Sequence, residues 1–234
     1  MKKIALALAL AAAGNLGVGS VSAAELLIDH FSVGTGFVQD TIDPIPPAPF
    51  PSLNILGDGD AIGGSRTIAI VPGGTQNGTF AAVNRSPNFN QFFQDQGTGS
   101  SGTTTITWDK NGAAGGLGGV DLTLGGTNDA LQVNITSIDQ GMVTLTFDIV
   151  DSTAGARQLT LPGLSVGAQP FLFTAFTGTG NFTSVNSIKL TIAAGVASDV
   201  GLDLVQTRSV PVPATLALLG LGLMGVRLRR RKAA

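Results

Sequence analysis

The chain contains no cysteine among its 234 residues. Disulfide bridges, thiolate nucleophiles and cysteine-ligated zinc sites are therefore excluded. The only histidine is His30, so a metal site built from several histidines cannot form, and a Ser-His catalytic pair would have to use this residue. The only glutamate, Glu25, lies close to the N-terminus. Because these residue types carry most acid–base and nucleophilic chemistry, we expect a protein that is not an enzyme.

Basic residues are scarce in the middle of the chain. Residues 24–209 contain all 15 acidic residues, from Glu25 to Asp203, but only 6 of the 13 basic residues, which gives this part a net charge of −9. Nucleic acid is not expected as a partner, because binding its phosphates requires clustered lysine and arginine. An acidic domain is compatible with bound divalent cations, although solubility outside the cell explains the same charge more simply.

The N-terminus has the pattern of a secretory signal peptide. Two lysines precede the apolar stretch Ile4–Ala13, and small residues follow as far as Ala23 and Ala24. Small residues at these positions fit cleavage after either alanine. The apolar stretch is also short for a segment that spans a membrane. We therefore predict that residues 1–23 form a helical signal peptide, which directs the chain to the Sec export machinery and is then removed.

Residues 24–209 show the pattern of an all-β domain. Short runs of alternating apolar and polar residues are separated by Gly, Asn, Asp and Pro, which is typical of strands joined by turns. Turn residues 139–141 between two such runs predict a β-hairpin. The proline-rich segment 43–51 is expected to be a surface loop, because proline cannot take part in a central ladder. The expected strands are 26–31, 36–42, 66–71, 79–83, 88–94, 104–108, 120–124, 131–135, 143–149, 157–161, 171–175, 188–192 and 200–205.

These strands predict an antiparallel two-sheet sandwich, jelly-roll-like, with the signal peptide helix before it and a transmembrane helix after it. The first and last strands lie side by side in many jelly rolls, which would bring Asp29 and Asp203 close together. Ile106 and Trp108 are expected on one face of a strand, because side chains alternate along it. The phenylalanines of segment 88–94 have two interpretations: a surface that stacks on a sugar, or packing at the edge of the core, which we favour.

Two groups of aspartates are candidates for calcium binding. Asp58 and Asp60 alternate with glycines, a spacing that lets carboxylate oxygens converge on a hard cation. Asp29, Asp199 and Asp203 form the second group, if the first and last strands are neighbours. The alternative for the first group is a solvated turn, and the alternative for the second group is a set of exposed carboxylates at turns and strand edges. Calcium binding therefore remains one of two interpretations for each group.

The last 25 residues contain three successive parts. Pro211 and Pro213 end regular structure, because proline lacks an N–H and fixes φ. The run Ala214–Val226 then carries no charge, and a basic cluster, Arg227–Lys232, closes the chain. Thirteen helical residues reach only about 20 Å, short of the ~30 Å hydrocarbon core of a bilayer. The run therefore predicts a marginal membrane anchor whose basic end stays in the cytoplasm.

This segment resembles the PEP-CTERM sorting signal of Gram-negative bacteria. The signal has a Pro-x-Pro-Ala-Thr start, a Leu/Gly-rich helix and an arginine-rich end, and Val212 replaces its usual glutamate, as in the VPLPA variant. The resemblance implies export, temporary anchorage in the inner membrane over residues 210–234, and recognition by an exosortase, a membrane transpeptidase or protease. The residues that carry the resemblance are Pro211, Pro213, Ala214, Thr215, Arg229, Arg230 and Arg231.

We therefore expect a protein of the cell surface or extracellular matrix. Many proteins that resemble it are tied to exopolysaccharide and biofilm matrix, so the sandwich domain is expected to bind carbohydrate. Two alternatives remain open. The domain could be a secreted polysaccharide-active enzyme that uses aspartate pairs, or it could be a purely structural matrix protein. No cofactor other than the candidate calcium is expected.

Overall fold

The computed structural model describes residues 24–39, 52–56, 59–71, 73, 78–86, 88–140 and 143–210. The expected signal peptide, the proline-rich loop, Asp58 and the tail from Pro211 onward lie outside these residues. The described chain folds into strands and two short 3-10 turns. The strands are β1 (Leu26–Asp29), β2 (Gly36–Gln39), β3 (Ser52–Leu56), β4 (Ser65–Val71), β5 (Thr79–Arg85), β6 (Asn88–Gln96), β7 (Thr103–Trp108), β8 (Ala130–Ile138), β9 (Val143–Asp151), β10 (Ala156–Leu164), β11 (Gly167–Leu172), β12 (Thr177–Gly178), β13 (Val185–Ala194) and β14 (Val200–Arg208).

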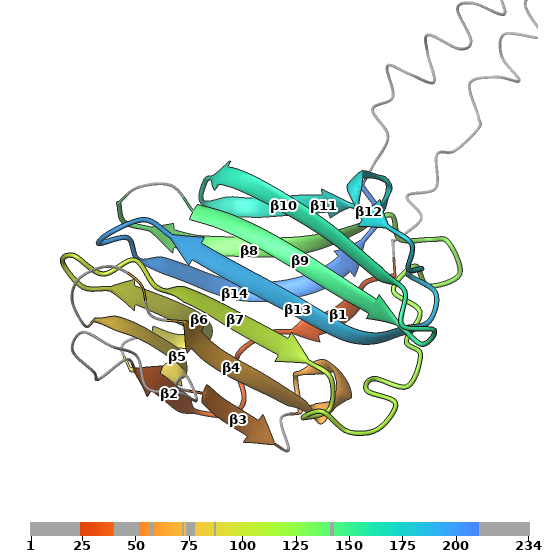
Figure 1. Cartoon of the computed structure of the whole chain (residues 1–234), viewed down its shortest axis with the longest axis horizontal. Coiled ribbons are helices and arrows are strands. Elements are labelled where there is room, and N and C mark those ends of the chain that lie inside the picture. The colour runs from red at the N-terminus through yellow and green to blue at the C-terminus, as the bar shows by residue number, and fades with distance from the viewer. Residues whose placement is uncertain are drawn as a thin grey trace, which may run out of the picture.

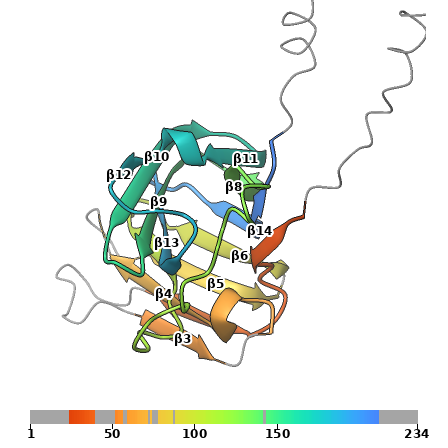
Figure 2. The ribbon, with the colours of Figure 1, turned by 90° about the vertical axis from the view of Figure 1, so that its right-hand side faces the viewer.

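Two antiparallel sheets of seven strands each lie face to face (Figures 1 and 2). Sheet A has the order β11-β8-β14-β6-β5-β2, with β1 added beside β14, and sheet B has the order β12-β10-β9-β13-β7-β4-β3. The expected two-sheet sandwich is thus confirmed. The first and last strands do pair, with Leu26 opposite Thr207.

The hydrophobic core fills the space between the sheets. In β9, Val143, Leu145, Phe147 and Ile149 are buried, whereas the residues between them are partly exposed. The same alternation recurs in the neighbouring strand β13. Because successive side chains of a strand point to opposite faces, each strand gives one face to the core and the other to solvent. Each sheet therefore has an outer face, and any binding surface has to be looked for there.

The expected hairpin at residues 139–141 is wrong. Strand β8 before this turn belongs to sheet A, and strand β9 after it belongs to sheet B. The Asp139 N–H donates to the Asp199 carbonyl at 3.1 Å, so the connection is held at the start of β14. Strands of both sheets show the same alternation when each has one buried face, and the pattern therefore could not assign two successive strands to one sheet.

Further strand assignments differ from the expectation. Residues 120–124 form turns, with only an isolated bridge between Val120 and Val185, because the Asp121 carboxylate accepts hydrogen bonds from Thr123 and Gly125. The expected strand 171–175 ends at Leu172, and the 3-10 turn Phe173–Ala175 follows. The strands β3 and β12 are additional to the expected strands. Besides Phe173–Ala175, the described residues contain a second 3-10 turn, Ile62–Gly64, which lies between β3 and β4.

Candidate functional site

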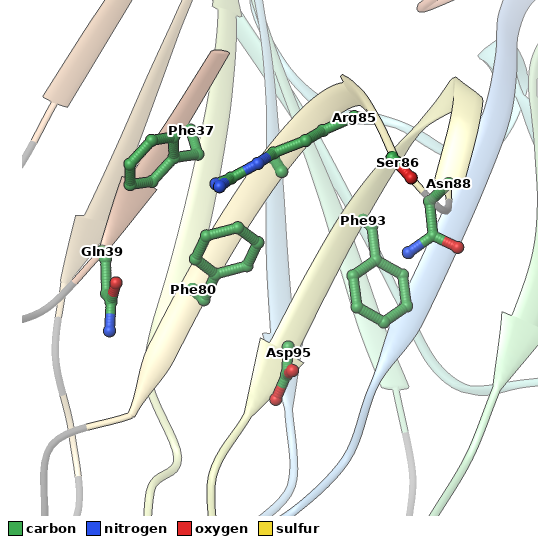
Figure 3. Close-up of a pocket in the computed structure, with 9 residues that line it drawn as sticks. Phe37, Gln39, Phe80, Arg85, Ser86, Asn88, Phe93 and Asp95 are labelled. Atoms are coloured by element: carbon green, nitrogen blue, oxygen red, sulfur yellow. The ribbon is translucent and has the colours of Figure 1, made fainter.

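A hollow of ≈ 400 Å³ opens on the outer face of sheet A, over strands β2, β5 and β6 (Figure 3). Its lining combines aromatic rings with charged and amide groups. The lining residues are Phe37, Gln39, Phe80, Ala82, Arg85, Ser86, Asn88, Phe93 and Asp95. A volume in this range is typical of sites for small molecules or for one segment of a polymer.

Strand register explains the shape of the hollow. Phe37 lies opposite Ala82, and Ala82 lies opposite Phe93, so these three residues form one row across the strands. Neighbouring strands are about 4.8 Å apart, so the two phenylalanines stand roughly 10 Å from one another. The small alanine between them leaves the floor low. A second row, Gln39 opposite Phe80 opposite Asp95, continues the surface along the strands.

Aromatic surface in the hollow comes from phenylalanine alone. The chain contains no tyrosine, and its one tryptophan, Trp108, is buried in the core. Phe37 is 49% exposed. Its ring is stacked with that of Phe80, with 5.6 Å between ring centroids and 28° between ring planes. Phe37 and Phe80 therefore form an aromatic patch on the outer face of sheet A.

The guanidinium of Arg85 lies over these rings. Its carbon atom Cζ is 4.1 Å from the centroid of Phe37 and 5.6 Å from that of Phe80. Both distances are within the range of cation–π attraction. Figure 3 shows the side chain of Arg85 reaching from the end of β5 between the two rings. The aromatic contacts therefore hold the guanidinium plane at the rim of the hollow.

Asp95 contributes a carboxyl group on the other wall. Partial burial raises the pKa of Asp95, and the negative charge and hydrogen bonding of Asp199 raise it further. Asp199 is fixed by the Gln96 N–H, which donates to its Oδ1 at 3.0 Å. With Asn88, Ser86 and Gln39, the hollow offers both donors and acceptors beside its apolar rings.

Polar side chains continue across the outer face of sheet A toward β11. Thr136 donates to Gln91 at 2.8 Å, the Asn134 amide donates to Asp203 at 2.7 Å, and Arg208 donates to Gln132. A second, smaller hollow of ≈ 160 Å³ lies at that end, lined by Gln132, Ala168, Pro170, Arg208 and Val210. The outer face of sheet A is therefore a polar strip with a hollow at each end.

Asp29, a calcium candidate, lies in the centre of the sandwich and is fully buried. Its Oδ1 accepts from Nη1 of Arg66 and from the Phe31 N–H, both at 2.8 Å. Its Oδ2 accepts from Nε1 of Trp108 at 2.7 Å. Burial raises the pKa of Asp29 to about 6, although these three partners all favour the ionised form. The neighbouring His30 is exposed.

Asp60 also contacts Arg66, but it mainly holds the segment after β1. Its Oδ2 accepts from the Ser32 N–H at 2.6 Å, from the Ser32 hydroxyl at 2.7 Å and from the Val33 N–H at 3.1 Å. Its Oδ1 lies 3.3 Å from Nη2 of Arg66. The structure therefore brings Asp29 and Asp60 together through Arg66, a pairing that the sequence did not indicate.

The remaining candidates lie apart from this pair. Asp203 is partly exposed and bound by Asn134 on the outer face of sheet A, whereas Asp199 contacts Asp95 and Gln96. Asp58 lies outside the described residues. Among the residues that the structure describes, no group of three or more His, Asp or Glu side chains is arranged to hold a metal ion. Calcium binding stays a prediction.

Most of the residues that line the hollow could not be identified from the sequence alone. Of its aromatic residues only Phe93 belonged to the phenylalanine cluster considered above, and the structure divides that cluster. Phe92 is buried in the core, Phe93 lines the hollow, and Phe89 is 62% exposed outside it. Packing in the core, the favoured interpretation, therefore holds for Phe92, whereas stacking on a sugar stays a prediction for the exposed rings. The alternation of apolar and polar residues could place Phe37 and Phe80 on the outer face of a sheet. Only the order of the strands, in which β2 pairs with β5, shows that these two residues are neighbours.

The described chain ends directly after β14, where the Val210 N–H donates to the Asp129 carboxylate at 2.7 Å. Residues 209–232, which begin at this point, match the PEP-CTERM protein-sorting motif. The chain carries a PEP-CTERM sorting motif. This motif indicates an exported protein with a membrane-anchored stage, and it implies processing by an exosortase. The transmembrane helix expected within the motif lies outside the described residues. Within them, no helix is long and apolar enough to cross a membrane.

The domain ahead of the PEP-CTERM motif is distantly similar to solved carbohydrate-related structures. CtCBM11 shares 10% identity at a TM-score of 0.42, over 82% of this chain and 99% of that one. TmCBM61, solved in complex with β-1,4-galactotriose, shares 14% identity at a TM-score of 0.28, over 70% and 91%. The agarase AgWH50C shares 10% identity at a TM-score of 0.39, and this chain covers 23% of its length. No curated protein matches the chain.

Proposed function

We propose that this PEP-CTERM protein is a non-enzymatic protein of the cell surface or extracellular matrix whose sandwich domain binds exopolysaccharide. The hollow over β2, β5 and β6 is the observation that carries the proposal. Sugars have apolar C–H faces and a rim of hydroxyl groups. A site for them therefore needs exposed rings beside hydrogen-bonding groups, which is the combination that Phe37, Phe93, Asn88 and Asp95 supply.

The arrangement favours binding over hydrolysis. A glycosidase needs two carboxyl groups on either side of the scissile bond, about 5–9 Å apart. Asp95 is the only carboxylate among the residues that line the described hollow, and its nearest acidic neighbour, Asp199, is in hydrogen-bond contact with it. Two carboxyl groups in contact leave no room for a sugar bond between them.

Binding can be tested by isothermal titration and affinity electrophoresis of the exported protein with a panel of purified bacterial and plant polysaccharides. Phe37→Ala and Phe93→Ala should each weaken binding of the active polysaccharide about five- to tenfold, in line with the free energy of one aromatic contact. Phe89→Ala is the matched control, because Phe89 is exposed but does not line the hollow. The proposal fails if no polysaccharide binds, or if the two hollow variants bind as well as the control.

A further inference from the structure

We infer that the hollow selects polysaccharides whose sugars carry carboxylate groups, with Arg85 as the residue that binds the carboxylate. This inference rests on the proposed carbohydrate binding and adds a ligand class to it. A guanidinium presents pairs of parallel N–H donors that match the two oxygens of a carboxylate.

Three of the four described arginines are engaged within the protein. Arg66 is ion-paired with Asp29 and Asp60, Arg157 donates to the carbonyls of Gly180 and Phe176, and Arg208 donates to Gln132. Arg85 differs from them. Within the described part of the chain its guanidinium makes no hydrogen bond and no ion pair, and its contacts are the faces of Phe37 and Phe80.

This position leaves Arg85 ready for an anion. Stacking on a ring uses the face of the guanidinium plane, so the N–H donors along its edges stay available. The stacking also restricts the side chain before any ligand arrives, which lowers the entropy lost on binding. An arginine free in solvent would not have this restraint. The placement of Arg85 at the rim of a hollow lined by aromatic rings therefore suits recognition of a charged group on a sugar.

The rest of the hollow is consistent with one uronate ring. Phe80 and the guanidinium of Arg85 pack against Phe37, so a sugar ring in the hollow would lie between this group and Phe93. Its carboxylate would face Arg85, and its hydroxyls would face Asn88 and Asp95. The domain carries a net charge of −9, which repels an anionic polymer at long range. Selection therefore depends on the short-range contact with Arg85, and not on the field of the whole domain.

A matched pair of polymers tests the inference on the exported protein: polygalacturonate and the same polymer after full methyl esterification, which removes the charge but keeps the backbone. The unmodified protein should bind the free acid at least about tenfold more tightly. Arg85→Gln should abolish this preference, and Arg85→Lys should keep only part of it, because an ammonium lacks the planar pair of donors. Lys110→Gln, which removes the same charge from an exposed loop residue, should leave the preference intact.

Different outcomes separate this inference from the proposed function. Phe93→Ala should weaken binding of both polymers, because it removes a ring and no charge. Equal affinity for acid and ester, or a preference that persists in Arg85→Gln, overturns the role of Arg85 while carbohydrate binding stands. Dextran sulfate and dextran form a second pair of polymers, with and without sulfate charge. If the protein prefers dextran sulfate to dextran more strongly than it prefers the acid to the ester, the choice of carboxylate as the ligand is overturned. The protein could also bind none of these four polymers and yet bind a neutral polysaccharide in a way that depends on Phe93. This outcome overturns the inference about carboxylate groups, whereas the proposed carbohydrate binding stands.

Discussion

The indole N–H of Trp108 donates a 2.7 Å hydrogen bond to Oδ2 of Asp29, and both side chains have no exposed surface. Asp29 ends β1 in sheet A, whereas Trp108 ends β7 in sheet B. The other carboxylate oxygen accepts from Arg66 of β4, which also belongs to sheet B. One buried carboxylate therefore joins the two sheets by polar contacts.

Replacing Trp108 should be costly because it leaves Asp29 with an unsatisfied oxygen. Trp108→Phe removes the donor to Oδ2 and part of a fully buried ring, and we expect the free energy of unfolding to fall by about 2–4 kcal/mol. Urea denaturation followed by circular dichroism measures this. Ile106→Val, at an equally buried position of the same strand, should cost only about 1 kcal/mol. Equal costs for the two variants would show that the hydrogen bond contributes nothing.

Stability should also depend on pH through Asp29. Burial raises its pKa from 3.8 to about 6, so the folded state binds this proton more tightly than the unfolded state does. The contribution of Asp29 to stability is therefore greatest below about pH 4, is lost as the pH rises to about 6, and is constant above that. The loss amounts to about 3 kcal/mol.

Asp29→Asn isolates this effect, because asparagine cannot titrate. Urea denaturation of both proteins between about pH 4 and pH 7 should show the difference in unfolding free energy, unmodified protein minus variant, falling by about 3 kcal/mol across this range. A difference that stays constant, or that rises with pH, would mean that Arg66 and Trp108 outweigh burial and keep Asp29 ionised at low pH.

The inward residues of most strands could be predicted from the sequence, because the alternation in β9 or β13 directly reflects one buried face. The order of the strands could not. The error at residues 139–141 arose because both sheets carry the same local pattern, and the pairing of Phe37, Ala82 and Phe93 depends on that missing order. The expected pairing of the first and last strands makes Asp29 a calcium candidate, whereas its engagement by Arg66 and Trp108 is visible only in three dimensions.

Filling the hollow should weaken polysaccharide binding without harming the fold. Ala82 forms its floor, and Ala82→Leu would project a larger side chain between Phe37 and Phe93. We expect affinity to drop more than about tenfold, since the sugar would lose its contact with at least one ring. Ala193→Leu, on the outer face of sheet B, is the control and should bind normally. Unimpaired binding by Ala82→Leu, in protein with unchanged urea unfolding, would place the ligand elsewhere.

The PEP-CTERM motif makes a prediction about the mature chain. Intact-mass spectrometry of protein from cells and from the medium should show an N-terminus after Ala23 or Ala24 and a C-terminus near Pro211. The physical reason is that the apolar run reaches only about 20 Å as a helix, which suits a temporary hold in the membrane. A mature chain that retains the residues as far as Ala234 would argue for permanent anchorage instead.

Strand β14 is the last strand of the domain, yet it lies in the middle of sheet A, between β8 and β6. Among the described strands, β1 pairs with β14 alone. Sheet A therefore cannot be completed from the earlier part of the chain, because β6, β8 and β1 all pair with β14. The sorting motif begins at residue 209, immediately after β14. The domain should finish folding only as its sorting signal arrives, which couples the timing of assembly to delivery.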